Sequence, residues 1–257
     1  MSTFLIEKST LVLIEYEANR ANRFISQCEI ARKQAFEFKD AKFFVGLAYQ
    51  RAFLSQVCYL QGASTDLIID LLRQAVSDFL IGLELGYPTE AIEINNWFYR
   101  SLVANDNSLS HFLASLPAEV WSYGETFPRF QAYWGFAQLR RQPDEAMKCL
   151  DFLYGWCFES GDDPEENEED QQINQLEQNG YHIMHAIFTR DTDSAVQYLH
   201  ERSRLRPIIP PEGTRYELFQ PLDLLGLGLC AIAKHSGLSI NLNEPSIPLI
   251  LLRPHGK

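Results

Sequence analysis

Residues 41–60 read AKFFVGLAYQRAFLSQVCYL, and the pattern in this stretch decides the fold class. Its apolar side chains recur at three- and four-residue spacing, at Phe43, Phe44, Leu47, Ala48, Phe53, Leu54, Val57 and Cys58. An α-helix turns once in about 3.6 residues, so this spacing places the apolar side chains on one helical face. Sustained alternation of apolar and polar residues, which is typical of half-buried strands, is scarce in the chain. The sequence therefore predicts an all-α protein.

The helical period continues through most of the chain. It predicts helices at residues 10–38, 41–61, 65–85, 89–104, 108–116, 128–140, 143–159, 168–188, 192–204 and 219–236. The first range is long enough for two helices, and residues 19–22 are its weakest part by helix propensity. Because 46% of the 257 residues are hydrophobic, we expect a real core within one continuous, single all-helical domain over residues 1–257.

One arrangement recurs along the chain: a long helix, a tight polar turn with an Asp or Ser that can cap, and a shorter amphipathic helix. It occurs in GASTDLIIDLLRQA (62–75), ANDNSLSHFLASLP (104–117), RQPDEAMKCLDFL (141–153) and RDTDSAVQYLHER (190–202). A side-chain oxygen at such a turn accepts a hydrogen bond from an otherwise unpaired amide at the helix start. The copies begin about 40 to 50 residues apart, near the period of helical-hairpin repeats. They predict diverged helical hairpins, stacked as an irregular solenoid or a layered helical bundle.

Two segments interrupt the helical pattern. The first is an acidic loop at residues 160–170, in which seven carboxylates occur with no basic residue. The second is a proline-rich connection at residues 206–217, where three prolines forbid helix and impose an extended chain. In the last predicted helix, Gly226 and Gly228 lower the helix propensity, so we expect close packing to require their small size.

Composition limits the compartment and the classes of partner. The net charge is −12 and the isoelectric point is about 5.0, which argues against nucleic acid and favours a basic partner. The five cysteines form no C-x-x-C pair, which fits a reducing compartment. We see no secretion signal at the start and no apolar run of the roughly 20 residues that a membrane-spanning helix needs. A cytoplasmic protein without a membrane partner is therefore expected.

The candidates for catalytic chemistry are few. His182 and His185 stand three residues apart in GYHIMHAIF, as two ligands on one helical face would, but no third zinc ligand stands at a recognisable spacing. No G-x-S-x-G nucleophile motif occurs, and GLGLC lacks the lysine of a phosphate-binding loop. We therefore expect no enzyme activity, no metal and no cofactor, and interpret the pair as ordinary histidines of an amphipathic helix.

The candidates for partner binding are acidic and aromatic. Most large rings occur at helical spacing and are expected in the core, whereas WSYGETFPRF (121–130) looks like a loop that can expose a ring. The acidic run has two interpretations, a solvated linker or a surface for a basic partner. The partner-binding candidates are Asp162, Asp163, Glu165, Glu166, Glu168, Glu169, Asp170, Trp121 and Tyr123.

Three stretches resemble a known family in their layout. They are NNWFYRSLVANDNSLSHFLASLP (95–117), HIMHAIFTRDTDSAVQYLHERSR (182–204) and PLDLLGLGLCAIAKHSGLSINLNEPSIPLILL (221–252). Together they resemble the immunity protein 49 family, all-helical bacterial proteins found beside polymorphic toxin genes. The resemblance implies a protein that binds and neutralises a cognate toxin by blocking its active site. It carries no catalytic, metal or other functional residue over to this chain.

Two other functions remain open at this point. A helical-repeat adaptor or chaperone would use similar surfaces to bind an effector without inhibiting it. An enzyme would depend on the histidine pair, and this is the least favoured hypothesis. The leading expectation is a cytoplasmic immunity protein whose partner is a toxin with a basic surface.

Overall fold

The computed structural model describes residues 8–37, 40–106, 111–112, 115, 127–159, 168–205 and 221–252. The elements in these ranges are α1 (Lys8–Glu37), α2 (Ala41–Leu60), α3 (Thr65–Glu84), α4 (Ala91–Val103), α6 (Phe127–Arg140), α7 (Pro143–Tyr154), η2 (Gly155–Glu159), α8 (Glu168–Thr189), α9 (Thr192–Leu205), α10 (Leu224–His235) and η4 (Leu249–Leu252). The described part holds no strand, only the isolated bridge between Glu244 and Ile247. The all-α prediction is confirmed.

Three predicted helix boundaries need correction or comment. The first range is one continuous helix, α1, rather than two. The range 143–159 is α-helical only to Tyr154, and η2 continues it as a π-helical turn. The last helix begins at Leu224 rather than at 219, because the Asp223 side chain accepts a hydrogen bond from the Gly226 amide (3.0 Å) and caps the helix there. The predicted helix at 108–116 lies mostly outside the described residues.

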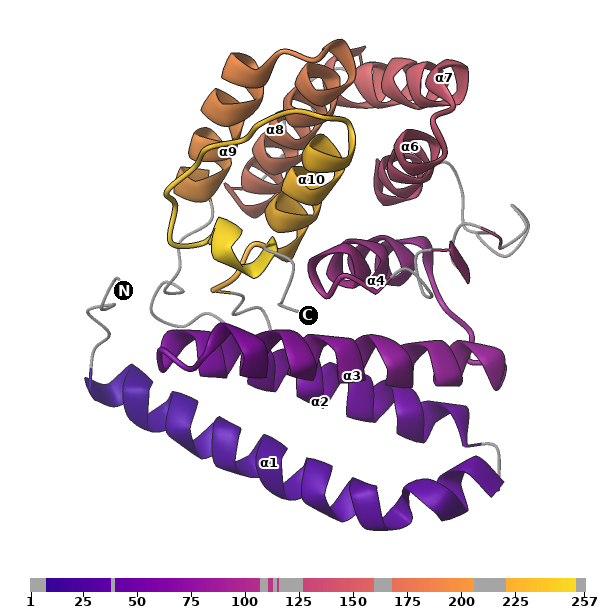
Figure 1. Ribbon diagram of the computed structural model, residues 1–257, viewed down its shortest axis with the longest axis vertical. Coiled ribbons are helices and arrows are strands. Elements are labelled where there is room, and N and C mark those ends of the chain that lie inside the picture. Colours follow the sequence, from indigo (N-terminus) through magenta and orange to yellow (C-terminus); the bar gives the residue numbers. More distant parts are fainter. Residues whose placement is uncertain are drawn as a thin grey trace.

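The helices pack as neighbours along the chain, with one return. Figure 1 shows α1, α2 and α3 side by side along one edge of the molecule, while α6 to α10 form the opposite part. Helix α4 lies between them and contacts α3 on one side and α6 and α10 on the other. The α10 contact brings the end of the chain back to its middle. The arrangement of the hairpins as a solenoid or layered bundle stays a prediction.

Polar turns start several helices in the expected way. The Ser64 hydroxyl accepts a hydrogen bond from the Leu67 amide at 3.3 Å, at the start of α3. The Asp191 carboxylate accepts one from the Ser194 amide at 3.1 Å, at the start of α9. Helix α7 differs, because its N-cap Gln142 makes no side-chain capping bond and Pro143 takes the first helical position. Proline is well suited there, because its missing amide would have no partner within the helix.

Large rings from α3, α4 and α6 fill the core around α4. Trp97 is fully buried and stacks on Phe79, with ring centroids 4.5 Å apart. Helix α10 approaches α4 closely at Gly228, where an added Cβ atom would lie 2.5 Å from Cδ1 of Tyr99. A Cβ atom at Gly226 would lie 2.6 Å from the Asp223 carboxylate. The expectation that close packing requires these two glycines is confirmed.

Two arginine–aspartate pairs are buried among the helices. Arg51 of α2 pairs with Asp78 of α3. Arg202 of α9 pairs with Asp223, with Nε 2.5 Å from Oδ2. All five cysteines are free thiols. Among the described helices, none is long and apolar enough to cross a membrane.

Candidate aromatic binding face

The structure describes little of the predicted partner-binding set. Six of its members lie outside the described residues: Asp162, Asp163, Glu165, Glu166, Trp121 and Tyr123. The backbone of residues 168–170 forms the first turn of α8, so Glu168, Glu169 and Asp170 do not belong to a loop. These acidic residues therefore continue directly into a helix that packs against α7 and η2.

A different set of side chains is exposed just before the acidic segment. Tyr154, Trp156 and Phe158 are 47%, 40% and 39% exposed and lie within five residues of one another. We call these three residues the aromatic face, in which the Tyr154 and Phe158 rings are neighbours (centroids 5.2 Å apart) and the Trp156 ring lies beside that of Phe152 (6.3 Å). They lie at the end of α7 and in η2, on an outer part of the molecule (Figure 1).

The sequence spacing explains why these rings are not all buried. Rings occur at every second position, at Phe152, Tyr154, Trp156 and Phe158. Residues two apart on an α-helix point to nearly opposite sides, so four such rings cannot share one buried face. Phe152 is half-buried and stacks on Phe130 of α6, with centroids 3.6 Å apart, and on Trp156, with centroids 6.3 Å apart. After Tyr154 the chain forms the wider π-helical turn η2. Such turns are frequent at functional sites.

Helix α8 holds the π-helical turn in place. The Trp156 indole Nε1 donates a hydrogen bond to Oε2 of Glu177 at 2.8 Å. The Gln178 side-chain amide donates one to the Cys157 carbonyl oxygen at 3.1 Å. Burial raises the pKa of Glu177, and the hydrogen bond from Trp156 opposes that shift. These contacts tie the π-helical turn to α8.

The aromatic face continues into a row of rings on α8 and α9. Tyr181 lies 5.9 Å from the Tyr154 ring and 5.5 Å from the Phe158 ring, measured between centroids. His182 stacks almost parallel on Tyr198 at 4.7 Å. Burial and the neighbouring His185 lower the pKa of His182. The ring of His182 is thus engaged in stacking, and the described residues contain no group of three or more His, Cys, Asp or Glu side chains placed to hold a metal.

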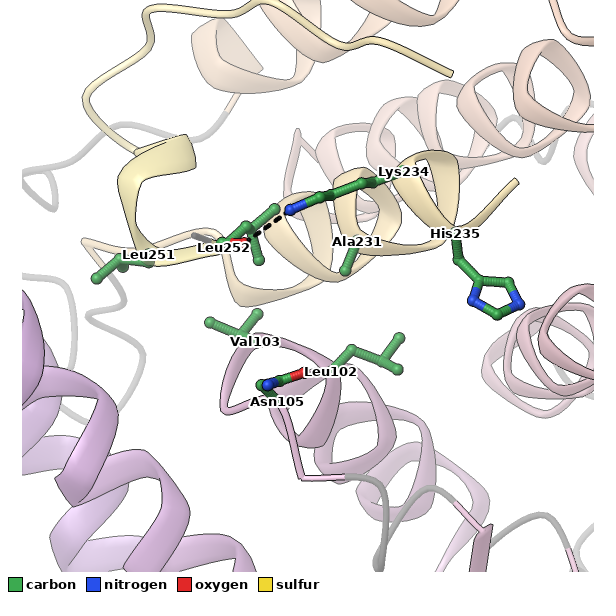
Figure 2. Close-up of a pocket in the computed structure, with 8 residues that line it drawn as sticks. All are labelled: Leu102, Val103, Asn105, Ala231, Lys234, His235, Leu251 and Leu252. Carbon is green, nitrogen blue, oxygen red and sulfur yellow. Dashed lines mark hydrogen bonds between the residues drawn. The ribbon is translucent and has the colours of Figure 1, made fainter. Parts of the chain in front are cut away.

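A cavity between α4 and α10 offers little for chemistry. Figure 2 shows its lining, which is mostly aliphatic and encloses about 340 Å³. Lys234 is the cation there, and its Nζ donates a hydrogen bond to the Leu252 carbonyl oxygen at 3.2 Å. His235 points away from the leucines (Figure 2). The lining brings together no nucleophile and base.

The cysteines that lie near or beneath the aromatic face are not activated nucleophiles. Burial raises the pKa of both Cys149 and Cys157 to about 12. At neutral pH these thiols are therefore protonated, whereas a catalytic cysteine needs a lowered pKa. What this region presents is ring surface, held in place by hydrogen bonds to α8.

The aromatic face was not predicted from the sequence. Most rings were expected in the core, and the exposed anchor was expected at Trp121 or Tyr123. The two-residue spacing of rings from Phe152 to Phe158 was the available signal, because it does not fit a single buried side of a helix.

The chain was also compared with known proteins. No family model, curated protein or solved structure matches it. The likeness to the immunity protein 49 family therefore stays a prediction.

Proposed function

We propose that this protein is a bacterial immunity protein that binds a cognate toxin and blocks the active site of that toxin. The observation that supports binding is the aromatic face, three exposed large rings on a turn that α8 holds in place. Tryptophan and tyrosine are enriched among the interface residues that contribute most to affinity. The likeness in layout to the immunity protein 49 family supports the more specific function.

The rings supply affinity because they are exposed and already positioned. Truncating a central aromatic anchor in an interface costs about 2 kcal/mol or more of binding free energy. The bonds from Trp156 to Glu177 and from Gln178 to Cys157 restrict the turn in the free protein. A partner therefore spends less of its binding energy on ordering this surface.

Charge supports a basic partner. The chain has 34 acidic and 22 basic residues, and the densest acidic run, residues 161–170, follows η2 directly in the sequence. Like charges repel one another in the free protein, so a cationic surface relieves that repulsion. Toxins whose active sites bind anionic substrates have cationic clefts, and an acidic protein that covers such a cleft inhibits without chemistry of its own.

The first experiment identifies the partner and tests the aromatic face. The full chain, a Trp156→Ala/Phe158→Ala variant and a Tyr16→Ala control are used to capture partners from the native host. Tyr16 is 63% exposed on α1, at the opposite edge of the molecule (Figure 1). The wild type and the control are expected to retain one basic protein encoded beside this gene, and the double variant is expected to lose it. Equal capture by all three would place the interface elsewhere.

A second experiment separates an immunity protein from an adaptor. The captured partner is assayed for toxicity and for its own activity with and without the chain. Inhibition at a one-to-one ratio, and lethality of deleting this gene only when the partner gene is present, are expected. A partner that binds with undiminished activity and no such lethality would identify an adaptor or chaperone.

The role of the acidic run has its own test. The variant replaces each acidic residue of the run by its amide, Asn or Gln, which keeps the length and removes the charge. The replaced residues are Asp162, Asp163, Glu165, Glu166, Glu168, Glu169 and Asp170. Electrostatic steering contributes on the order of ten- to a thousand-fold to association rates and weakens as salt rises. The neutralised variant is expected to bind more slowly with a shallower salt dependence. Identical rates and salt slopes would identify the run as a solvated linker.

A further inference from the structure

A smaller cavity lies where α4 faces α8, α9 and α10. It encloses about 260 Å³, and Asn96 and Arg100 of α4 line it together with Leu176, Arg202 and Leu225. One wall is fixed, because the guanidinium of Arg202 bonds both oxygens of Asp223 at 2.5 and 3.3 Å. The cavity is therefore a preformed space with polar groups on its α4 side.

Arg100 is unusual among the arginines of this interior. Its guanidinium carbon lies 4.5 Å from the ring centre of Trp97 and 5.9 Å from that of Tyr49. Its Nη1 atom is shielded from solvent and has no hydrogen-bonding partner in the described residues. Burial lowers the pKa of Arg100 to about 10, so the side chain is still charged at neutral pH.

The two other interior arginines show what Arg100 lacks. Arg51 pairs with Asp78, and Arg202 pairs with Asp223. No carboxylate in the described ranges pairs with Arg100, although the chain has 34 acidic residues. The Trp97 ring covers the flat face of the guanidinium. The N–H groups lie in the plane of the guanidinium, so this stacking gives them no hydrogen-bond acceptor. A partly buried cation without an acceptor is unfavourable in the free protein.

We propose that this cavity binds a small oxyanion, a phosphate or a carboxylate group, with Arg100 as the cationic partner. The planar fork of a guanidinium binds two oxygens of such a group at once. The exposed side-chain amide of Asn96, one turn earlier on the same side of α4, supplies a further donor. The ligand compensates the charge that the fold leaves unpaired. The site uses none of the three residues of the aromatic face and does not depend on the immunity function.

The test titrates inorganic phosphate and acetate into the full chain by calorimetry at constant ionic strength. The variants are Arg100→Met, which keeps the length of the side chain, and Arg204→Met, which removes the same charge from an exposed position on α9. The wild type and Arg204→Met are expected to show one saturable site, and Arg100→Met to bind at least about tenfold more weakly. Tighter phosphate binding identifies a phosphate ligand, and tighter acetate binding identifies a carboxylate.

Thermal unfolding gives a readout that a purely structural arginine would not produce. Without anion, Arg100→Met is expected to be at least as stable as the wild type, because it removes an unpaired charge. The better anion is expected to raise Tm in a saturable way for the wild type and Arg204→Met only. If Arg100→Met does not fold, Arg100→Lys replaces it, with weaker binding expected because the fork is lost. Lack of saturable binding by the wild type, or equal binding by the Arg100 variant, would overturn the proposal.

Discussion

Two clusters of aromatic residues in this protein differ in their exposure to solvent. On α4, Trp97, Phe98 and Tyr99 are consecutive in the sequence and all three are fully buried. At the end of α7 and in η2, Trp156 and its neighbours alternate with other residues and remain about 40% exposed. The two clusters have similar side chains, so residue type does not decide which rings become core.

The position of the helix in the fold decides whether its rings are buried. Helix α4 is enclosed, with α3 on one side and α6 and α10 on the other, so rings on several of its sides find buried partners. Helix α7 lies at an edge and contacts α6, α8 and η2, so one of its sides has no covering helix from the described part of the chain (Figure 1). Aromatic residues on an edge helix are therefore better candidates for binding than equally large residues on an enclosed one.

The largest expected difference is in stability. Trp97→Ala removes a fully buried ring that stacks on Phe79, and cavity formation of this kind costs about 3 to 5 kcal/mol. Trp156→Ala is expected to cost less, about 1 kcal/mol, because the ring is already 40% exposed and the bond to Glu177 and the contact with Phe152 lie near the surface. Urea unfolding followed by circular dichroism measures both. Equal losses would show that the aromatic face is part of the core.

A second prediction concerns how closely α10 encloses α4. Gly228→Ala places a methyl group against the Tyr99 ring and is expected to cost about 1 to 3 kcal/mol. Gly46→Ala on α2 is the matched control, since nothing lies within 4 Å of its added Cβ and alanine favours helix by about 1 kcal/mol. Opposite signs for the two variants are expected in the same unfolding assay. A neutral Gly228→Ala would mean that α10 shifts easily and that α4 is less enclosed.

The helices were predictable from sequence because their signals are local. The three- and four-residue period placed α2, α3 and α9 within a few residues of their observed ends. The small size required at Gly228 was also predictable, because a glycine in a buried helix lowers propensity without any local gain. The start of α10 was predicted too early. Apolar residues before Asp223 fit the helical period, but Asp223 caps the helix, which therefore begins after it.

The aromatic face was not predictable in the same way. Whether Trp97 or Trp156 is buried depends on which helices surround α4 and α7, and those neighbours come from distant parts of the chain. The residues of η2 are as apolar as those of the helix before it. The helical period therefore predicted that α7 continues to Glu159. Exposure is thus a property of the assembled fold, and only the two-residue ring spacing indicated it locally.

The smallest expected effect concerns pH and the ring row beside the aromatic face. Burial, and then the charge of His185, lower the pKa of His182 from its ordinary value of 6.5, while Glu201 opposes them. The folded protein therefore binds fewer protons at His182 than the unfolded chain as the pH falls through 6.5. Well above pH 6.5 both states are neutral there and His182 adds no pH dependence. Below it, stability is expected to fall because protonation favours the unfolded chain.

His182→Gln removes this titration, and the informative quantity is the change in Tm between pH 8 and pH 5.5. The wild type is expected to lose more than the variant over that interval, by on the order of 1 °C, because the partly exposed site is screened by solvent. Subtracting the pH 8 value removes the lost stacking on Tyr198, which is the same at both pH values. His235→Gln on α10, at an exposed position, is expected to follow the wild type. A variant that loses as much as the wild type would show that His182 is hydrated as fully as an exposed histidine, and the row of half-buried rings would then end at Tyr181.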